Sequence, residues 1–268
     1  MRLSIRKSAL YFLLSAILLA AGGFFGSKVV HPPILLTKQE TSYTFNSKLW
    51  RLFDLGLHAA WADILWIQTL LESDLEHYNK RDLNSWLYLR FLAISELDPK
   101  FYENYLVGGE YLMIIKDDLD GANHLLRKGL THYPDDMALN WHLGFLWIFE
   151  KQNIEVGYPF FEKVSLSPDR PIMFDSIFTK LKAQSYGIKD AFDFAFESWK
   201  RHEEGSPIKL RLGVELYSLK AKIDLECLNA KRTDCERLDF EGKPYFKKKG
   251  AWTASKPLIN ITLKFKKK

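Results

Sequence analysis

Histidines, serines and glycine-rich turns are the places where this sequence could carry chemistry, and their spacing assembles no known catalytic motif. The seven histidines are His31, His58, His77, His124, His132, His142 and His202. No pair has the HExxH spacing that places two imidazoles on one helix face for zinc, and no GxSxG sequence offers a serine nucleophile. Gly108-Gly109 falls inside an expected helix, so it provides no phosphate-binding loop. We therefore expect no catalytic residue, no cofactor and no metal.

Asp63 is a carboxylate in an apolar setting, next to Trp61 and Ile64. A buried carboxylate in such a setting could serve as a functional acid. A structural role is simpler, in which Asp63 caps a neighbouring backbone or pairs with an arginine such as Arg90, and we expect this role. An unrecognised hydrolase, acting through Asp63 or the histidines in a cleft, remains an alternative.

The chain has two cysteines, Cys227 and Cys235. Two nearby cysteines in an exported chain predict a disulfide, which would join the end of a helix to the segment that follows. Metal binding is not expected, because there is no CxxC sequence and no histidine beside either cysteine. Two free buried thiols are the alternative.

The positive charge is concentrated at one end of the sequence. Nine lysines and no acid lie between Lys243 and Lys268, which leaves −4 for the first 242 residues of a chain whose net charge is +5. This Lys-rich tail could contact anionic lipid or another polyanion. It could equally be a solvated tail that protects an edge strand from aggregation.

An apolar run from about Ala9 to Gly26 follows Arg2, Arg6 and Lys7. At about 1.5 Å per residue, roughly 18 residues reach about 27 Å, which is close to the thickness of a bilayer's hydrocarbon core. We expect a signal anchor over residues 1–27, with the N-terminus in the cytoplasm of a bacterial-type cell and the bulk of the chain in the periplasm. Cleavage after the anchor and a buried helix of a soluble protein are the alternatives.

Helical periodicity begins after a linker, residues 28–45, that contains Pro32-Pro33 and is expected to be extended. Asn46 is expected to cap a long helix in which apolar residues recur every three or four positions. Those residues are Trp50, Phe53, Leu57, Ala60, Ile64, Ile67 and Leu71. A polar stretch, residues 72–85, interrupts the pattern, and a second helix from Trp86 to Leu97 stops before Pro99.

From Pro99 onward the pattern repeats. Pro99, Pro134 and Pro168 are separated by 35 and 34 residues. Small residues recur about twelve positions before the end of each repeat, and they would let two helices approach closely. They include Ala122, Gly157 and Ala191, with Gly108-Gly109 and Gly144 on the partner helices.

This spacing, with small contact residues and a closing proline, resembles the tetratricopeptide repeat. The resemblance covers roughly Asn104 to Trp199, and residues 137–168 form its best unit, with Gly144, Trp147 and Pro168 in the family's places. It implies an all-α fold, an α-solenoid of stacked helical hairpins, for residues 46–230. The helix Pro207–Asn229 is expected to cap the stack, and residues 231–268 form a basic C-terminal segment with a short β-hairpin.

The resemblance also implies a function, since repeats of this kind usually bind a peptide or helix in a concave groove. Carried onto this chain, the partner-binding groove positions are Asn104, Tyr111, Trp141, Phe145, Asp175, Thr179 and Lys182. Each of the aromatic residues could instead pack between hairpins. No nucleic acid is expected as a partner outside the cytoplasm.

The function that we expect is therefore a membrane-anchored periplasmic scaffold that binds a protein partner. It would be an accessory subunit of an envelope assembly, such as a pilus, secretion or surface-polymer machine. A cleaved, soluble periplasmic binder, held to polyanions by the Lys-rich tail, is the alternative from a different class. An envelope-polymer enzyme is the third.

Overall fold

The structure is a computed structural model that describes residues 37–263 apart from 45 and 54, together with residues 15–18, 20, 21 and 24. The chain divides after Thr44 into two units, residues 1–44 and residues 45–268. The predicted anchor, residues 1–27, lies largely outside the described residues. Within the part of the chain that the structure describes, no helix combines the length and the apolar character needed to cross a membrane.

The expected extended linker is helical over part of its length, so that prediction was wrong there. Helix α2 spans Lys38–Thr44. Thr37 and Glu40 explain its start, because the Thr37 Oγ1 accepts a hydrogen bond from the Glu40 backbone N–H at 3.2 Å, and the Thr37 backbone N–H donates to the Glu40 carboxylate at 2.8 Å. This reciprocal arrangement is a capping box, which fixes the first turn of a helix.

The long helix predicted from Asn46 is broken into two. Helix α3 spans Ser47–Phe53 and helix α4 spans His58–Glu72. Asn46 caps α3 as expected, since its Oδ1 accepts a hydrogen bond from the Leu49 backbone N–H at 3.2 Å. The break falls at Leu55 and Gly56, whose φ angles of +52° and +83° are incompatible with a continuous right-handed helix.

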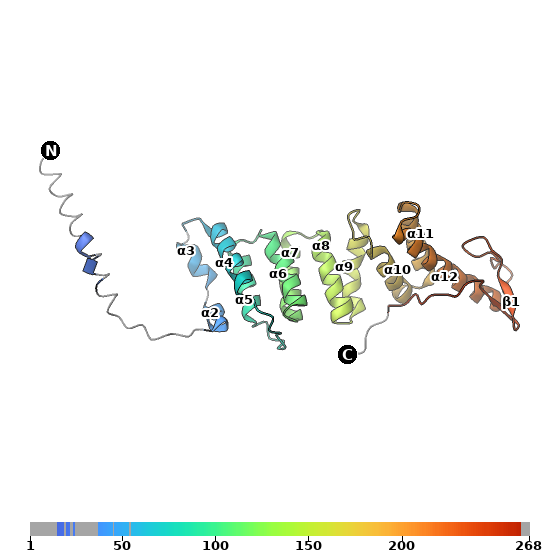
Figure 1. The fold of residues 1–268 in the computed structure, drawn as a ribbon, viewed down its shortest axis with the longest axis horizontal. Coiled ribbons are helices and arrows are strands. Elements are labelled where there is room, and N and C mark those ends of the chain that lie inside the picture. The colour runs from blue at the N-terminus through green and yellow to red at the C-terminus, as the bar shows by residue number, and fades with distance from the viewer. Residues whose placement is uncertain are drawn as a thin grey trace, which may run out of the picture. The chain divides into compact units, whose positions relative to one another are not determined.

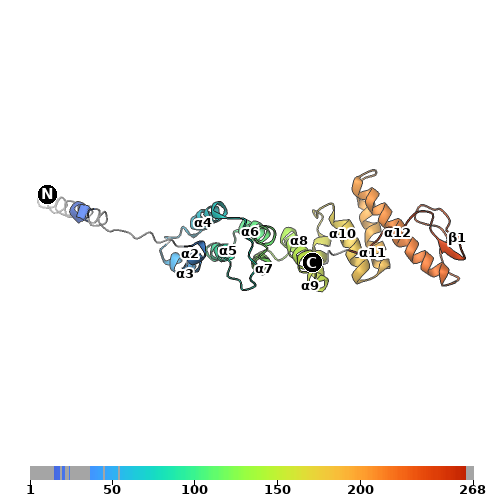
Figure 2. The ribbon, with the colours of Figure 1, turned by 60° about the horizontal axis from the view of Figure 1, so that its bottom comes forward.

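The remainder of the second unit is mainly helical, as predicted (Figures 1 and 2). Its helices are α5 (Trp86–Leu97), α6 (Tyr102–Ile114), α7 (Leu119–His132), α8 (Met137–Phe145), the π-helical turn η1 (Leu146–Glu150), α9 (Ile154–Leu166), α10 (Phe174–Ser185), α11 (Ile188–Arg201) and α12 (Pro207–Asn229). The closest packing is between neighbours along the chain: α4 with α5, α6 with α7, α8 with α9, α10 with α11, and α11 with α12. Helices two apart, such as α6 and α8, also touch, so each pair packs on the next.

The turn within each pair contains one residue with a positive φ angle: Leu83, Asp117, Gln152 and Gly187, with φ of +54°, +55°, +51° and +111°. The first three are left-handed, whereas Gly187 has an extended ψ of 169° and is itself the N-cap of α11. These positions are 34, 35 and 35 residues apart, so the period found in the sequence is also present in the backbone. The residues that follow two of them cap the next helix: Asp118 accepts from the Gly121 N–H at 2.9 Å, and Asn153 accepts from the Val156 N–H at 3.2 Å.

Small residues lie where the paired helices approach most closely. A Cβ added to Gly144 in α8 would lie within 2.5 Å of the Phe161 Cε1 in α9, and closer still to its Cδ1. A Cβ on Gly109 in α6 would meet Leu126 in α7 at 2.5 Å. Glycine is therefore needed at both positions for space, because neither has a positive φ.

The hydrophobic core is a series of clusters along the helices, as expected when each hairpin contacts only its neighbours. The first cluster joins α4 to α8, the second joins η1 and α9 to α10, and the third joins α11 to α12. At the C-terminal end, β1 (Phe246–Lys248) pairs antiparallel with β2 (Ala251–Thr253), which confirms the small hairpin.

The segment after the hairpin runs back along the helices toward α10 (Figure 1). The Ile259 N–H donates to the Ser218 Oγ at 3.2 Å, and Ile261, 2% exposed, belongs to the α11–α12 cluster. Leu263 packs against the cluster that contains Phe174 and Phe178. This C-terminal strap, residues 254–263, thus connects α12 to the preceding hairpins.

Candidate functional site

The three predicted groove aromatics are half-buried, and each contacts the helices around it. The Tyr111 hydroxyl lies 2.7 Å from the Ser73 Oγ. Trp141 stacks on Phe161 with a centroid distance of 5.1 Å and an interplanar angle of 5°. Phe145 packs on Phe149 at 5.0 Å. Trp141 also contacts Phe174 of the next hairpin, with a centroid distance of 6.0 Å, so the aromatics pack both within and between hairpins and only part of each ring faces solvent.

The polar groove positions are more deeply buried than a binding surface requires. Asn104 is 0% exposed and donates from its Nδ2 to the Phe91 carbonyl at 3.0 Å. Thr179 is also 0% exposed and donates to the Asp175 carbonyl at 2.8 Å. Asn104 therefore links α6 to α5, and Thr179 bonds within its own helix α10. Lys182 is half-buried, with its ammonium 5.5 Å from the centre of the Phe178 ring.

Asp175 is the centre of a buried ionic cluster. Its two oxygens accept from the Arg170 Nε at 2.7 Å and lie 2.9 Å from the His202 Nε2. The Arg170 and Asp175 side chains are 8% and 3% exposed. Removing one member of such a pair leaves a buried charge without compensation, so Asp175 stabilises the turn between α9 and α10.

The expected environment of Asp63 was wrong. Asp63 is exposed on α4, and Arg90 pairs with Glu72, at 3.5 Å, near the end of the same helix. Ala62 and Thr69 face the core instead. The general-acid role considered for Asp63 loses its basis, since that role required burial.

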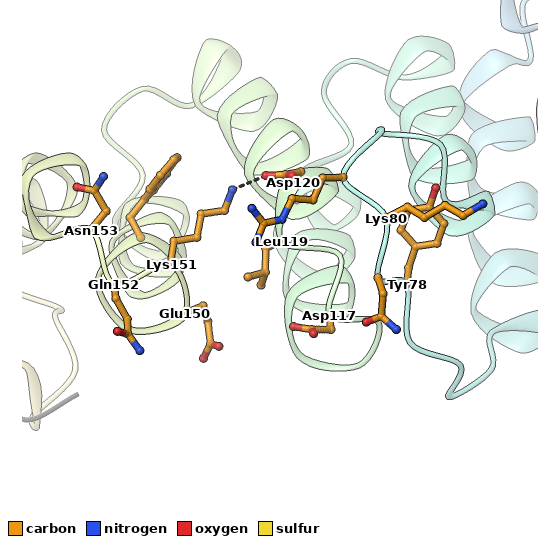
Figure 3. Close-up of a pocket in the computed structure, with 12 residues that line it drawn as sticks. Tyr78, Lys80, Asp117, Leu119, Asp120, Glu150, Lys151, Gln152 and Asn153 are labelled. Atoms are coloured by element: carbon orange, nitrogen blue, oxygen red, sulfur yellow. Dashed lines mark hydrogen bonds and ion pairs between the residues drawn. The ribbon is translucent and has the colours of Figure 1, made fainter. Parts of the chain in front are cut away.

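A polar pocket of about 650 Å³ lies along the edge where the hairpin turns follow one another (Figure 3). The turns between α4 and α5, α6 and α7, and η1 and α9 form its walls. Its lining residues are Tyr78, Asn79, Lys80, Arg81, Asp117, Leu119, Asp120, Trp147, Glu150, Lys151, Gln152 and Asn153. We call it the edge pocket.

The walls of the edge pocket are held by contacts between turns. The Tyr78 N–H donates to the Lys116 carbonyl at 2.6 Å, and the buried Lys116 ammonium pairs with Asp74. The Ser85 hydroxyl donates to the Asp118 carboxylate, whose pKa is raised by burial despite that hydrogen bond. These contacts fix the 73–85 loop against the α6–α7 turn.

The floor of the pocket mixes charges of both signs. Lys151 reaches from its turn toward Asp120 and forms an ion pair with it (Figure 3). The Lys151 ammonium lies 4.7 Å from the centre of the Trp147 ring. Asp117 and Gln152 project from the two left-handed turn positions. Carboxylates, amides and an aromatic ring together suit a polar, uncharged or zwitterionic ligand.

An exposed apolar surface lies on α3 and α4. Its most exposed side chains include Phe53 (78%), Leu55 (92%) and Leu71 (82%). The periodic residues that predict the helix are therefore the exposed ones, and the opposite side of α4 packs on α5. Periodicity predicted the helix but not which side is exposed, because the stretch has apolar residues on nearly every face.

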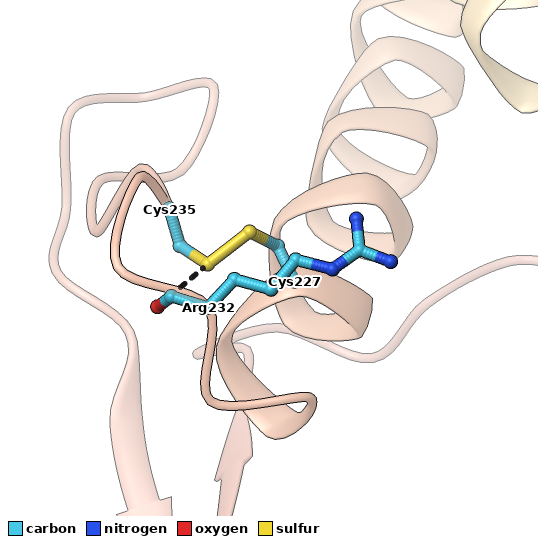
Figure 4. Close-up of a disulfide and its surroundings, with 3 residues drawn as sticks. All are labelled: Cys227, Arg232 and Cys235. Carbon is cyan, nitrogen blue, oxygen red and sulfur yellow. Dashed lines mark hydrogen bonds between the residues drawn. A yellow bond between two sulfur atoms is a disulfide. The ribbon is translucent and has the colours of Figure 1, made fainter.

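Cys227 and Cys235 form a disulfide, with a Cα–Cα distance of 5.6 Å (Figure 4). It joins the last turn of α12 to the loop that leads into the hairpin. Asp234 lies close to both sulfurs. Because the sulfurs are bonded to each other, this group offers no thiolate to a metal.

Comparison with known proteins adds no relative: no protein-family model, no curated protein and no solved structure matches the chain.

Proposed function

We propose that this chain is a membrane-anchored scaffold, built as a tetratricopeptide-like α-solenoid that binds a protein partner on the face formed by α6, α8 and α10. The observation that carries the proposal is the turn residue with a positive φ angle that recurs every 34–35 residues, at Leu83, Asp117, Gln152 and Gly187. We expect hairpins that repeat at this interval to stack in similar orientations, so that the first helix of each pair contributes to one continuous surface.

The exposed parts of Tyr111, Trp141 and Phe145 provide aromatic contact area on that surface. Aromatic residues with little side-chain entropy to lose are effective anchors for a bound segment. Lys182 adds a cation on α10. Asn104, Asp175 and Thr179 are buried, so we leave them out of the set of residues proposed to contact the partner.

A periplasmic location is supported by two features. Positive residues precede the apolar run 9–26, which favours an N-terminus in the cytoplasm and the remaining chain outside. The Cys227–Cys235 disulfide is the form expected in an oxidising compartment. The scaffold would then serve as an accessory subunit of an envelope assembly, a pilus, secretion or surface-polymer machine.

Crosslinking and co-purification of the tagged full chain from its native membranes tests this function. The Tyr111/Trp141/Phe145→Ala variant is expected to lose specific protein partners. Its matched control removes three exposed apolar side chains elsewhere and is expected to keep them: Leu166, Leu210 and Phe246→Ala.

Because Trp141 is packed against Phe161, the triple variant could lose folding as well as binding. Lys182→Glu provides a second test, since it reverses a charge on the same face without removing a ring. Partners retained by both variants would refute the groove, and the absence of any specific protein partner would refute the scaffold.

A second candidate function is recognition of a polar envelope polymer in the edge pocket. The specific observation is the mixed lining of carboxylates, amides and cations around Trp147. Arg81→Ala and Gln152→Ala are expected to abolish binding of a soluble polysaccharide fraction measured by calorimetry. Equal binding by the unaltered chain and both variants would exclude the pocket.

A further inference from the structure

Large exposed apolar side chains are concentrated in one short part of the chain. Ten lie between residues 49 and 75, whereas the following 188 described residues contain eleven. The ten are Leu49, Trp50, Phe53, Leu55, Leu57, Trp61, Ile64, Ile67, Leu71 and Leu75. We call this surface the α3–α4 apolar face. Scattered apolar side chains are normal on soluble proteins, but this many large exposed ones in so short a part of the chain indicate an interaction surface.

Helix α4 has exposed polar side chains at Asp63 and Gln68, but its apolar residues lie on two sides. Ala62 and Thr69 are fully buried toward the core, and Ile64, Ile67 and Leu71 form the outward side at spacings of three and four residues. A helix that is apolar on both sides is usually covered on both sides. One covering layer is α5, and the other must come from outside the helical unit.

The corner between α3 and α4 projects its apolar residues into solvent. Leu55 is 92% exposed and has a φ of +52°, and Gly56 follows with +83°. A left-handed leucine costs free energy, which is tolerated when the surrounding structure or a function requires that geometry. Phe53 and Leu57 extend the projecting corner on either side, at 78% and 58% exposure.

Two tryptophans border this face. The Trp50 and Trp61 rings lie 4.9 Å apart in an edge-to-face arrangement. Together with Ile64, Leu65 and Leu97 they line an apolar cavity of about 100 Å³. Tryptophan is enriched at the boundary between the headgroups and the hydrocarbon of a bilayer, because one end of the indole is apolar and the other is polar.

We propose that the α3–α4 apolar face inserts into the interfacial layer of a phospholipid bilayer, with Leu55 at its deepest point. The proposal rests on the membrane anchor in the proposed function. Asn46 follows Gly26 by only 20 residues, and at about 3.3–3.6 Å per residue this tether keeps α3 and α4 within about 70 Å of the membrane.

The dimensions of α4 decide its orientation. Its 15 residues span about 22 Å, less than the roughly 30 Å of a hydrocarbon core, so the helix lies along the interface and does not cross it. Projecting aliphatic side chains with tryptophans at the edge are the features of such an interfacial helix. Docking of α5 on the other side then orients the helical stack relative to the membrane.

Depth-dependent fluorescence quenching tests this proposal. The full chain is reconstituted in vesicles of phosphatidylethanolamine and phosphatidylglycerol, carrying Ile67→Cys or Leu55→Cys labelled with an environment-sensitive fluorophore. Leu210→Cys is the matched control, because Leu210 on α12 is 64% exposed against 53% for Ile67. The native cysteines are unreactive, since they form the disulfide.

Labels at Ile67 and Leu55 are expected to be quenched at least about threefold more by lipids with a nitroxide near the headgroup than the label at Leu210. Equal quenching at all positions would overturn the proposal. So would a label at Ile67 that is shielded from water but not reached by the lipid quencher, because a protein surface would then cover the face. Alkaline carbonate extraction of the same vesicles tests the anchor separately. If the labels are quenched before extraction but carbonate then releases the chain from the vesicles, the anchor is refuted and the interfacial contact is retained.

Discussion

Replacing Gly144 with alanine tests how closely α8 and α9 approach each other. In an exposed helix, Gly→Ala stabilises by about 0.8–1 kcal/mol, because alanine restricts the unfolded chain and favours helical backbone. At Gly144 the new Cβ overlaps the ring of Phe161, which is fully buried and stacked on Trp141. The ring has no room to move, so the overlap is costly.

Gly213 in α12 provides the matched control. A Cβ there would lie 3.6 Å from the Trp199 Nε1, which is an ordinary van der Waals distance. Gly213→Ala should therefore gain most of the helical preference, about 0.5–1 kcal/mol. Overpacking usually costs about 1–3 kcal/mol, so after the helical gain Gly144→Ala should lose up to about 2 kcal/mol net and differ from the control by about 1–3 kcal/mol.

Urea unfolding followed by far-ultraviolet circular dichroism measures both variants, provided that their transitions keep a common slope. The double variant Gly144→Ala/Phe161→Leu should be destabilised less than the two single changes together, because leucine removes the ring atoms that overlap the new Cβ. The interaction free energy between the two changes in a double-mutant cycle measures this contact. If Gly144→Ala were as stable as Gly213→Ala, the close approach of α8 and α9 would be refuted.

Three further predictions concern stability. Asp175→Ala should lower the free energy of unfolding by about 3–5 kcal/mol, since it leaves the buried Arg170 without its carboxylate partner. Glu197→Ala removes an exposed ion pair and should cost less than about 1 kcal/mol, and urea unfolding of both variants measures the difference. Burial lowers the pKa of His142 below 6.5, so the unfolded chain takes up this proton first and stability falls as the pH drops from about 6.5 toward the folded-state pKa. His142→Gln should make that fall shallower in melts at pH 7.5, 6.5 and 5.5, and an unchanged slope would contradict the assignment. Cys227→Ala/Cys235→Ala should cost about 2–3 kcal/mol, and a reductant should destabilise the original chain to the same extent while leaving the variant unaffected.

Much of the helical arrangement was predictable because it follows from local chemistry. Proline at Pro99 and the Ser206-Pro207 pair fix the end of α5 and the start of α12, and both helices have the predicted bounds. The hairpin at residues 246–253 followed from alternating side chains around Gly250, whose φ is +86°. Each of these signals acts within a few residues, so no knowledge of the tertiary structure was needed.

The break at Leu55 and Gly56 was missed because one glycine within an apolar period is compatible with an uninterrupted helix. The exposed side of α4 was missed for a different reason. A period of three to four residues indicates which side chains share a face, but the position of α5 determines which face is covered. In a helix with apolar residues on both sides, the sequence offers no preference.

The candidate sites divide in the same way. The groove roles of Tyr111 and Trp141 stay predictions. The burial of Asp175 was not predictable, because it depends on Arg170 and His202, which lie in different turns. The edge pocket was not predictable, because Tyr78, Asp117 and Gln152 come from three turns. Only the stacking of hairpins brings those turns to one edge.

The C-terminal strap sets the order in which this chain completes its folding during synthesis. Clusters around α5–α9 draw on residues that emerge close together, so they form while the chain is still being made. The α11–α12 cluster lacks Ile261 until residues 230–263 have followed α12, and at about 5–20 residues per second this takes about 2–7 seconds. During that interval the cluster of Leu216 and Leu219 with α11 lacks Ile261, and it is the part of the nascent chain that a chaperone would be expected to bind.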